Sequence, residues 1–235
     1  MKKIVLVAAV VVAFTNLAFA EFGIFGNIRG SGNSSNFKDF ASAPAPTLVG
    51  PSQKFSKQSP EEHGMTPGFG VFYEHSKLFG MSEKSYIGVN VSYNGIGEDR
   101  LGYSIEDSVY SIQHAQVTSN GYQIPITVYY KYKTSPKFAL KAGAGVTYVF
   151  SKWELEYIES HIAGSASKTE TILAPHVDLG IEWILGKVVT LGFDLSYALG
   201  GKSNNPYILL GYESVKLNRD FSGLYAGANL RFYIL

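Results

Sequence analysis

Nine ionisable side chains recur at alternate positions of short apolar segments, and these side chains are where the chain could carry chemistry. Residues two apart on a β-strand point to the same face, so the alternation gathers the charges of each segment on one side. The nine residues are Arg29, Glu74, Lys131, Lys141, His176, Asp178, Glu182, Asp194 and Arg231. Carboxylates gathered with cations can form buried ion pairs or line a path for ions. We therefore expect a polar network inside whatever the strands enclose.

Lys141 and Glu182 are expected to pair, because both lie near the same end of two neighbouring strands. Two functional interpretations of the network follow. A structural plug of salt bridges is favoured, since unpaired buried charges are very costly. The alternative is a gated path of small conductance.

Asp194 lies on a strand between the strands of Asp178 and Arg231, and the sequence predicts an ion pair between Asp194 and Arg231. Removing one partner would leave a buried charge, whereas removing both would restore much of the stability. The alternation does not define how far neighbouring strands are shifted along each other. Glu74 and Asp178 therefore remain alternative partners of Arg231.

A hydrolase would need a nucleophile beside a general base. The nearest arrangement, His176-Val177-Asp178, supplies an acid where the nucleophile should be, and no spacing requires Ser196 in its place. The chain has no Cys, and its five His residues are scattered without the spacing of a metal site. We therefore expect no enzyme, no metal and no cofactor.

The C-terminal stretch 221–235 shows most clearly what positions these charges. One face of this stretch carries Leu224, Ala226, Ala228, Leu230, Phe232 and Ile234, and the other carries Tyr225, Gly227, Asn229, Arg231 and Tyr233. This period of two predicts a strand. A strand that crosses a lipid bilayer needs about 9 to 11 such residues. The stretch is long enough.

The same alternation predicts eight strands in all. They cover about 22–30, 68–77, 85–94, 122–132, 138–151, 173–183, 189–197 and 221–235. The long polar connections are 31–66, 95–121, 153–168 and 199–220, and short turns lie between them. Alternation of long and short connections is typical of a membrane barrel with exposed loops on one side and tight turns on the other. Pro125 has no N–H for the ladder, so a bulge or local irregularity is expected there.

The direction of the two faces separates a membrane barrel from a secreted ligand-binding barrel such as a lipocalin, whose apolar face points inward. In this chain the polar face holds mostly Gly, Ser, Asn and Tyr, which suits a narrow interior. The apolar face carries no charge, as lipid exposure demands, because a charge at mid-bilayer costs about 2 to 4 kcal/mol. The sequence therefore predicts an outward apolar face.

Residues 1–20 have the composition of a secretory signal peptide. Lys2 and Lys3 precede an apolar run at 4–14, and Ala18 and Ala20 fit a cleavage site. The run is shorter than the roughly 20 residues of a spanning helix. We expect cleavage before Glu21 and one barrel domain over 21–235. A net charge of +1 offers no electrostatic case for nucleic acid.

With a signal peptide, eight amphipathic strands and the closing segment 223–235 (GLYAGANLRFYIL), the chain resembles the small outer-membrane β-barrel superfamily of the OmpA transmembrane-domain and OmpX type. The resemblance implies an all-β, eight-stranded antiparallel up-and-down barrel in the outer membrane. It also implies contact with outer-membrane lipids and lipopolysaccharide, and insertion by the barrel-assembly machinery through the C-terminal strand. Such chains usually end on an outward aromatic residue, whereas Leu235 ends this one.

We expect a structural and surface-interaction scaffold that presents its exposed loops, chiefly 31–66 and 95–120, to a host or surface ligand. The alternative is a narrow pore or a transporter of small hydrophobic molecules. A lipid-modifying barrel is a third possibility, because outer-membrane lipid A deacylases resemble this chain in size. Those enzymes use a His and a Ser two apart on one strand, which His176 and Asp178 do not match.

Overall fold

The segments with period-two alternation form β-strands in the computed structural model. The structure describes residues 20–31, 54–57, 65–76, 81–106, 112–159, 162–201, 207–210, 213–216 and 221–234. The strands are β1 (Ala20–Ser31), β2 (Lys54–Lys57), β3 (Thr66–Ser76), β4 (Ser85–Glu106), β5 (Ile112–Lys133), β6 (Phe138–Glu159), β7 (Ile162–Ile184), β8 (Val189–Ala198), β9 (Tyr207–Leu210), β10 (Glu213–Lys216) and β11 (Gly223–Ile234). Among these residues, no helix is long and apolar enough to span a membrane.

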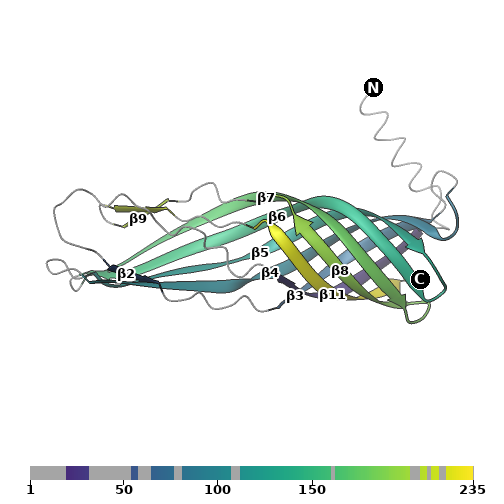
Figure 1. The fold of residues 1–235 in the computed structure, drawn as a ribbon, viewed down its shortest axis with the longest axis horizontal. Coiled ribbons are helices and arrows are strands. Elements are labelled where there is room, and N and C mark those ends of the chain that lie inside the picture. The colour runs from purple at the N-terminus through teal and green to yellow at the C-terminus, as the bar shows by residue number, and fades with distance from the viewer. Residues whose placement is uncertain are drawn as a thin grey trace, which may run out of the picture.

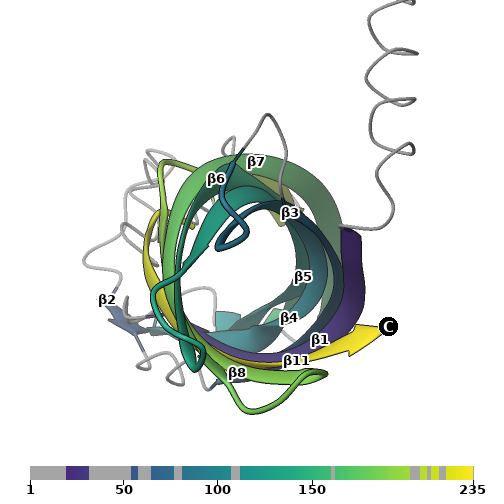
Figure 2. The ribbon, with the colours of Figure 1, turned by 90° about the vertical axis from the view of Figure 1, so that its right-hand side faces the viewer.

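Eight of the strands form a closed barrel (Figure 2). Its ring order is β1, β3, β4, β5, β6, β7, β8 and β11, and β11 pairs again with β1. Every pairing in the ring is antiparallel. Strand β2 pairs only with the far part of β4, and β9 pairs with β10 in a separate two-stranded sheet. The predicted eight-stranded up-and-down barrel is confirmed.

The two ends of the barrel differ. Short turns join β3 to β4, β5 to β6 and β7 to β8 at one end, which we call the turn end. The opposite end, the loop end, holds the long connections from β1 to β3 and from β8 to β11, together with the short ones from β4 to β5 and from β6 to β7. The N-terminal end of β1 and the C-terminal end of β11 both lie at the turn end, where Phe22 is the ladder partner of Ile234 (Figure 1).

Two of the predicted loops are wrong, because 95–121 and 153–168 are largely strand. Strands β4 to β7 continue far past the ends of β8, β11, β1 and β3 and form an extended sheet at the loop end (Figure 1). A register shift between Ile96 and Asp99 marks where β4 leaves the barrel. Beyond the barrel neither face contacts lipid, so no apolar alternation reveals the strand.

The other sequence predictions concern segments that are described only in part. Most of 31–66 and half of 199–220 lie outside the described residues, as do 1–19 of the predicted signal peptide, Lys77 and Leu235. At Pro125 the register of β4 with β5 is unbroken, but the ladder skips Ser92 and Tyr93, which face Pro125 and Ile124. That interruption agrees with a residue that has no N–H to donate.

The outer surface of the barrel is an apolar band between two rows of aromatic rings. Near the loop end the rings of Phe69, Tyr93, Tyr122 and Phe150 follow one another on four neighbouring strands, with centroids 5.6, 5.2 and 4.7 Å apart. Near the turn end, Phe138 stacks on Trp183. Ten residues separate Tyr122 from Tyr132 on β5. At about 3.3 Å per residue and a tilt of about 45°, they span about 23 Å, which matches a bilayer core crossed by a barrel.

The two tryptophans of the chain allow a test of this sidedness. Trp183 is half exposed on the apolar band, whereas Trp153 is fully buried and donates its indole N–H to Glu170. In vesicles of lipids brominated along the acyl chains, we expect strong quenching of the Trp183 emission in a Trp153→Phe variant. We expect little quenching of Trp153 in a Trp183→Phe variant. Equal quenching of both would contradict the orientation of the faces.

Candidate functional site

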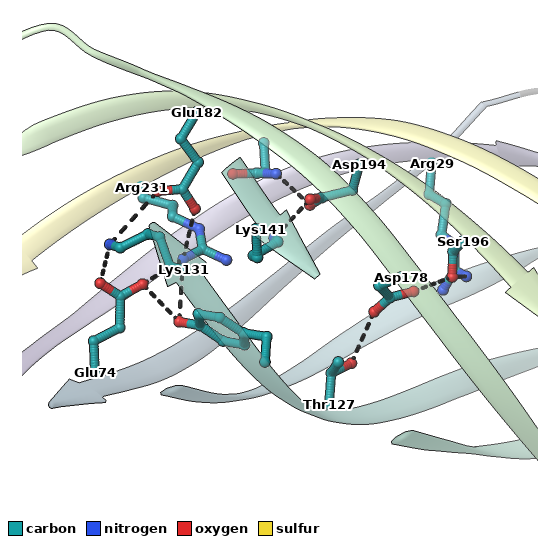
Figure 3. A network of polar contacts seen from close by, with 12 residues as sticks. Arg29, Glu74, Thr127, Lys131, Lys141, Asp178, Glu182, Asp194, Ser196 and Arg231 are labelled. Atoms are coloured by element: carbon teal, nitrogen blue, oxygen red, sulfur yellow. Dashed lines mark hydrogen bonds and ion pairs between the residues drawn. The ribbon is translucent and has the colours of Figure 1, made fainter. Parts of the chain in front are cut away.

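The polar interior of the barrel contains three groups of side chains (Figure 3). The group nearest the turn end, the floor cluster, consists of Glu74, Tyr129, Lys131, Glu182 and Arg231. Its four charged side chains are at most 1% exposed. Two cations face two carboxylates, so the cluster is neutral. Neutrality is what allows four charges to be buried at a bearable desolvation cost.

Glu74 is the centre of the floor cluster. Arg231 donates from Nη1 to its Oε1 at 3.0 Å, the Tyr129 hydroxyl donates to the same oxygen at 2.7 Å, and Lys131 Nζ donates to Oε2. Lys131 also donates to the hydroxyl of Tyr233 at 2.9 Å. The cluster thereby ties β3, β5 and β11 together across the interior.

Glu182 completes the floor cluster through charge alone. Its Oε1 lies 3.0 Å from Arg231 Nη1 and its Oε2 lies 3.6 Å from Lys131 Nζ. Among the described residues, neither oxygen has a partner in hydrogen-bond geometry. The predicted pairing of Asp194 with Arg231 is wrong, because Arg231 contacts Glu182 and Glu74, the latter one of its two alternative partners. The predicted pairing of Lys141 with Glu182 is also wrong.

Lys141 pairs with Asp194 in the second group, halfway along the interior. The distance from Nζ to Oδ1 is 2.6 Å, and Asn229 donates its Nδ2 to the other carboxylate oxygen, also at 2.6 Å. Gly180 lies between the two in the ladder, and a Cβ there would clash with the Asp194 carboxylate and lie 3.0 Å from Lys141 Cε. The absent side chain of Gly180 gives this ion pair its space.

The third group surrounds Asp178. Ser196 donates to its Oδ1 at 2.5 Å and Thr127 donates to its Oδ2 at 3.1 Å. Arg29 donates to the Ser196 hydroxyl at 2.9 Å and lies 4.5 Å above the ring of Tyr225. Ser196 thus links Asp178 to Arg29, and the charges of these two side chains cancel. Each of the three groups carries equal numbers of positive and negative side chains.

His176 belongs to the same group and is held on both ring nitrogens. Thr127 lies 2.9 Å from Nε2 and Thr147 lies 3.0 Å from Nδ1. Because Thr127 gives its only proton to Asp178, it must accept from Nε2–H, so a neutral ring accepts at Nδ1 from Thr147. In a nucleophilic triad the histidine would stand between serine and acid. Here Asp178 stands between Ser196 and His176, which lies 3.5 Å from its Oδ2.

Apolar side chains close the interior above these groups, and the sequence analysis did not find them. Val149, Ile172 and Phe221 are buried together with Ile96 packed against them, and we call these four residues the apolar cap. The signal existed in part, since Val149 continues the inward positions of β6 after Thr147. An apolar residue at such a position indicates a dry interior at that level.

Gly201 brings Phe221 into the apolar cap. The backbone N–H of Phe221 donates to the Gly201 carbonyl at 3.1 Å. Gly201 has φ +105°, and a Cβ on it would lie 2.8 Å from the Cβ of Ala174. Both the left-handed backbone and the close approach require glycine.

A polar cavity lies between the apolar cap and the floor cluster. Its volume is about 60 Å³, and it is lined by Arg29, Thr127, His176, Asp178, Ser196 and Asn229 among others. This is room for a few water molecules, at about 10 to 15 Å³ each. Among the described residues, no three His, Asp or Glu side chains are placed to hold a metal ion. The cavity separates two closures, one apolar and one ionic.

A closed ring with an apolar band outside and a neutral polar interior has no exposed sheet edge within the band, which is the condition for crossing a bilayer with strands. These features define a small integral outer-membrane β-barrel. The turn end is then the periplasmic end, and the extended sheet lies outside the cell.

No family model matches the sequence, and no curated protein matches it. Solved structures of similar shape include OprG of Pseudomonas aeruginosa, with 12% identity, 92% of this chain and 95% of that chain covered, and a TM-score of 0.43. Ail of Yersinia pestis has 10% identity, 92% and 96% coverage, and a TM-score of 0.39. The N-terminal barrel domain of Pseudomonas aeruginosa OprF has 10% identity, 91% and 97% coverage, and a TM-score of 0.39. The function of this chain is inferred from its own geometry, because likeness at this level carries no functional information.

Proposed function

We propose that this protein is a structural and surface-interaction scaffold: a closed barrel that anchors an extended sheet outside the outer membrane. The observation that carries the proposal is the unequal length of the barrel strands. Strands β4 to β7 each have 22 or 23 residues, whereas the other four barrel strands have 10 to 12. Beyond the aromatic row, about ten residues of each long strand lie in water.

The outer part of β7 gives this sheet a surface for interaction. Strand β7 pairs with β8 only from His176 onward, and the Pro175 carbonyl accepts from the Leu199 N–H. Residues 162–174 form no ladder on that side with any described strand, although β9 lies close to β7. An unpaired edge offers backbone N–H and C=O groups that can pair with an added extended peptide. The side chains of Ser165, Ser167 and Thr169 are exposed on this part of β7. A host or surface protein that adds a strand is the partner that we propose.

Further partners follow from the location. Outer-membrane lipids and lipopolysaccharide would contact the apolar band and the aromatic row, and the barrel-assembly machinery would recognise β11. The engaged state of His176 and Asp178 supports a role without catalysis. Transport of ions or of small hydrophobic molecules is the competing function, and the floor cluster and the apolar cap both argue against an open path.

Recording in planar bilayers tests the scaffold against the pore. We expect the purified chain to insert without steady ion conductance, because two closures lie in series along the interior. A Phe221→Ser variant removes only the apolar closure and should remain silent, since the floor cluster is intact. Steady conductance of the unaltered protein would contradict the scaffold and favour the pore.

A further inference from the structure

The chain between β8 and β11 forms one hairpin that pairs in two separate places. Strand β8 pairs with β11 up to Ala198 and Gly223, and β9 pairs with β10 further out, from Tyr207 and Lys216 onward. Both ladders are antiparallel and follow one another along the same two segments of chain. The small sheet of β9 and β10 is therefore the outer part of the β8–β11 hairpin, with β9 after β8 and β10 before β11.

The length of this hairpin matches the extended sheet. The first leg, from Val189 to Leu210, has 22 residues, and the second leg, from Glu213 to Ile234, also has 22. Strands β4 to β7 have 22 or 23 residues each. Strand β9 accordingly lies beside the outer part of β7, where Cα atoms of the two strands come within 8 Å although no ladder joins them (Figure 1).

Glycines interrupt the hairpin between its two ladders. Eight residues lie between the ladders on the first leg and six on the second. Gly200, Gly201 and Gly223 have φ +82°, +105° and +132°, and among the described residues they are the only glycines with positive φ. Such a backbone leaves the extended conformation at little cost in glycine. The outer ladder is thus not held to the orientation of the ladder between β8 and β11.

The backbone groups of β7 and β9 point toward one another. The Leu199 N–H donates to the Pro175 carbonyl at 2.6 Å, so the odd-numbered residues of β7 direct their backbone groups to this edge. On β9, Leu210 pairs with Glu213, and only two residues separate them. The polar groups of Leu210 therefore face β10, and those of Leu209 face the opposite side, toward β7.

We propose that β9 pairs antiparallel with residues 166–169 of β7, so that the β9–β10 hairpin is a removable cover of the β7 edge. The two extra residues on the first leg place Leu209 opposite Ser167 and Ile208 opposite Lys168. The structure shows the uncovered arrangement, with β9 beside the edge. A two-stranded sheet is marginally stable in water, so an added strand displaces the cover. This last step rests on the proposed function, whereas the pairing itself does not.

Hydrogen exchange, measured by magnetic resonance on the full barrel in detergent, tests the pairing. The amides of Ser167 and Thr169 should exchange roughly tenfold more slowly in the unaltered protein than in a Leu209→Pro variant. Proline removes the N–H that faces β7, and it is tolerated where a strand edge meets only water. The amides of Lys168 and Glu170 face β6 and should be equally slow in both proteins. Equal exchange at Ser167 and Thr169 in the two proteins would overturn the proposal.

A disulfide provides a second measurement, because the chain has no cysteine. Lys168→Cys with Ile208→Cys should cross-link on mild oxidation, since facing residues of paired strands have Cα atoms about 4.5 to 5.5 Å apart. The matched control is Lys168→Cys with Val215→Cys. Val215 is the ladder partner of Ile208 on β10, one further strand spacing of about 4.8 Å away, and should not cross-link. Absence of the first cross-link, or equal formation of both, would contradict the cover.

A labelled synthetic peptide with the sequence of residues 205–218 separates failure of the cover from failure of the proposed function. It should bind the Leu209→Pro protein roughly tenfold more tightly than the unaltered protein, because the cover competes for the same edge. Equal binding to both would overturn the cover and leave strand addition intact. Binding to neither, with the Ser167 and Thr169 amides protected, would support the cover and contradict strand addition.

Discussion

Replacement of Arg231 by methionine is expected to lower the free energy of unfolding by about 3 to 5 kcal/mol, the cost of leaving a buried charge without its partner. Arg231 contacts Glu74 and Glu182 at 3.0 Å each, and Lys131 alone would then face both carboxylates. The measurement is reversible denaturant unfolding of the protein in lipid vesicles. The loss should be among the largest of any single substitution in the chain.

Two further variants show that the effect is electrostatic. Adding Glu182→Gln to Arg231→Met restores neutrality and should recover much of the loss. Lys152 and Glu154 form an ion pair of the same kind in the extended sheet, where both side chains are roughly half exposed. Because water screens such a pair, Lys152→Met should cost at most about 1 kcal/mol. Equal costs for Arg231→Met and Lys152→Met would contradict a dry, neutral floor cluster.

Replacement of Val128 by arginine is expected to cost about 2 to 4 kcal/mol, because it places a charge on the lipid face near the middle of the bilayer. Val128 is 57% exposed and lies on β5 between the two aromatic rows. In a water-soluble barrel the same substitution would be nearly neutral. The free energy of unfolding in vesicles, together with the yield of inserted protein, gives the measurement.

Thr169→Arg is the matched control for that substitution. Thr169 is exposed on β7 beyond the aromatic row, two positions from Thr171, which pairs with Phe150. An arginine there stays in water and should change the stability by less than about 0.5 kcal/mol. If both substitutions cost the same, the aromatic rows do not mark the limits of the bilayer.

The direction of each strand face could be predicted from the sequence, because lipid on one side and packed polar groups on the other impose a strict period of two. Leu224 and Phe232 are outward and Arg231 is inward, as the alternation indicates. The ion pairs could not be predicted in this way. The ladder places Asp194 opposite Gly227, and Arg231 opposite Thr190, four residues further along each strand. At about 3.3 Å per residue this offset is about 13 Å, too long for an ion pair.

The shift between strands follows from closure of the whole ring and not from any one segment, so no local pattern encodes it. Closure of the ring also fixes the strand shifts that bring Arg231 to Glu74, which lies two strands away. Between them is Gly23, where a Cβ would clash with the ring of Phe72. The extended sheet escaped prediction for a different reason: neither of its faces contacts lipid, so its residues lack a hydrophobic period.

The ring order has a consequence for assembly. Every barrel pairing joins strands that follow one another along the chain, except for the one between β1 and β11, whose partners Phe22 and Ile234 lie at opposite ends of the described residues. Seven hairpin-like steps can therefore form in sequence, each closing a modest loop. The last pairing joins the two ends of the barrel chain and closes the longest loop of the eight pairings. Until these ten ladder pairs between β1 and β11 form, the protein is a curled sheet with two open edges. The pairing of β1 with β11 is therefore the step that closes the barrel.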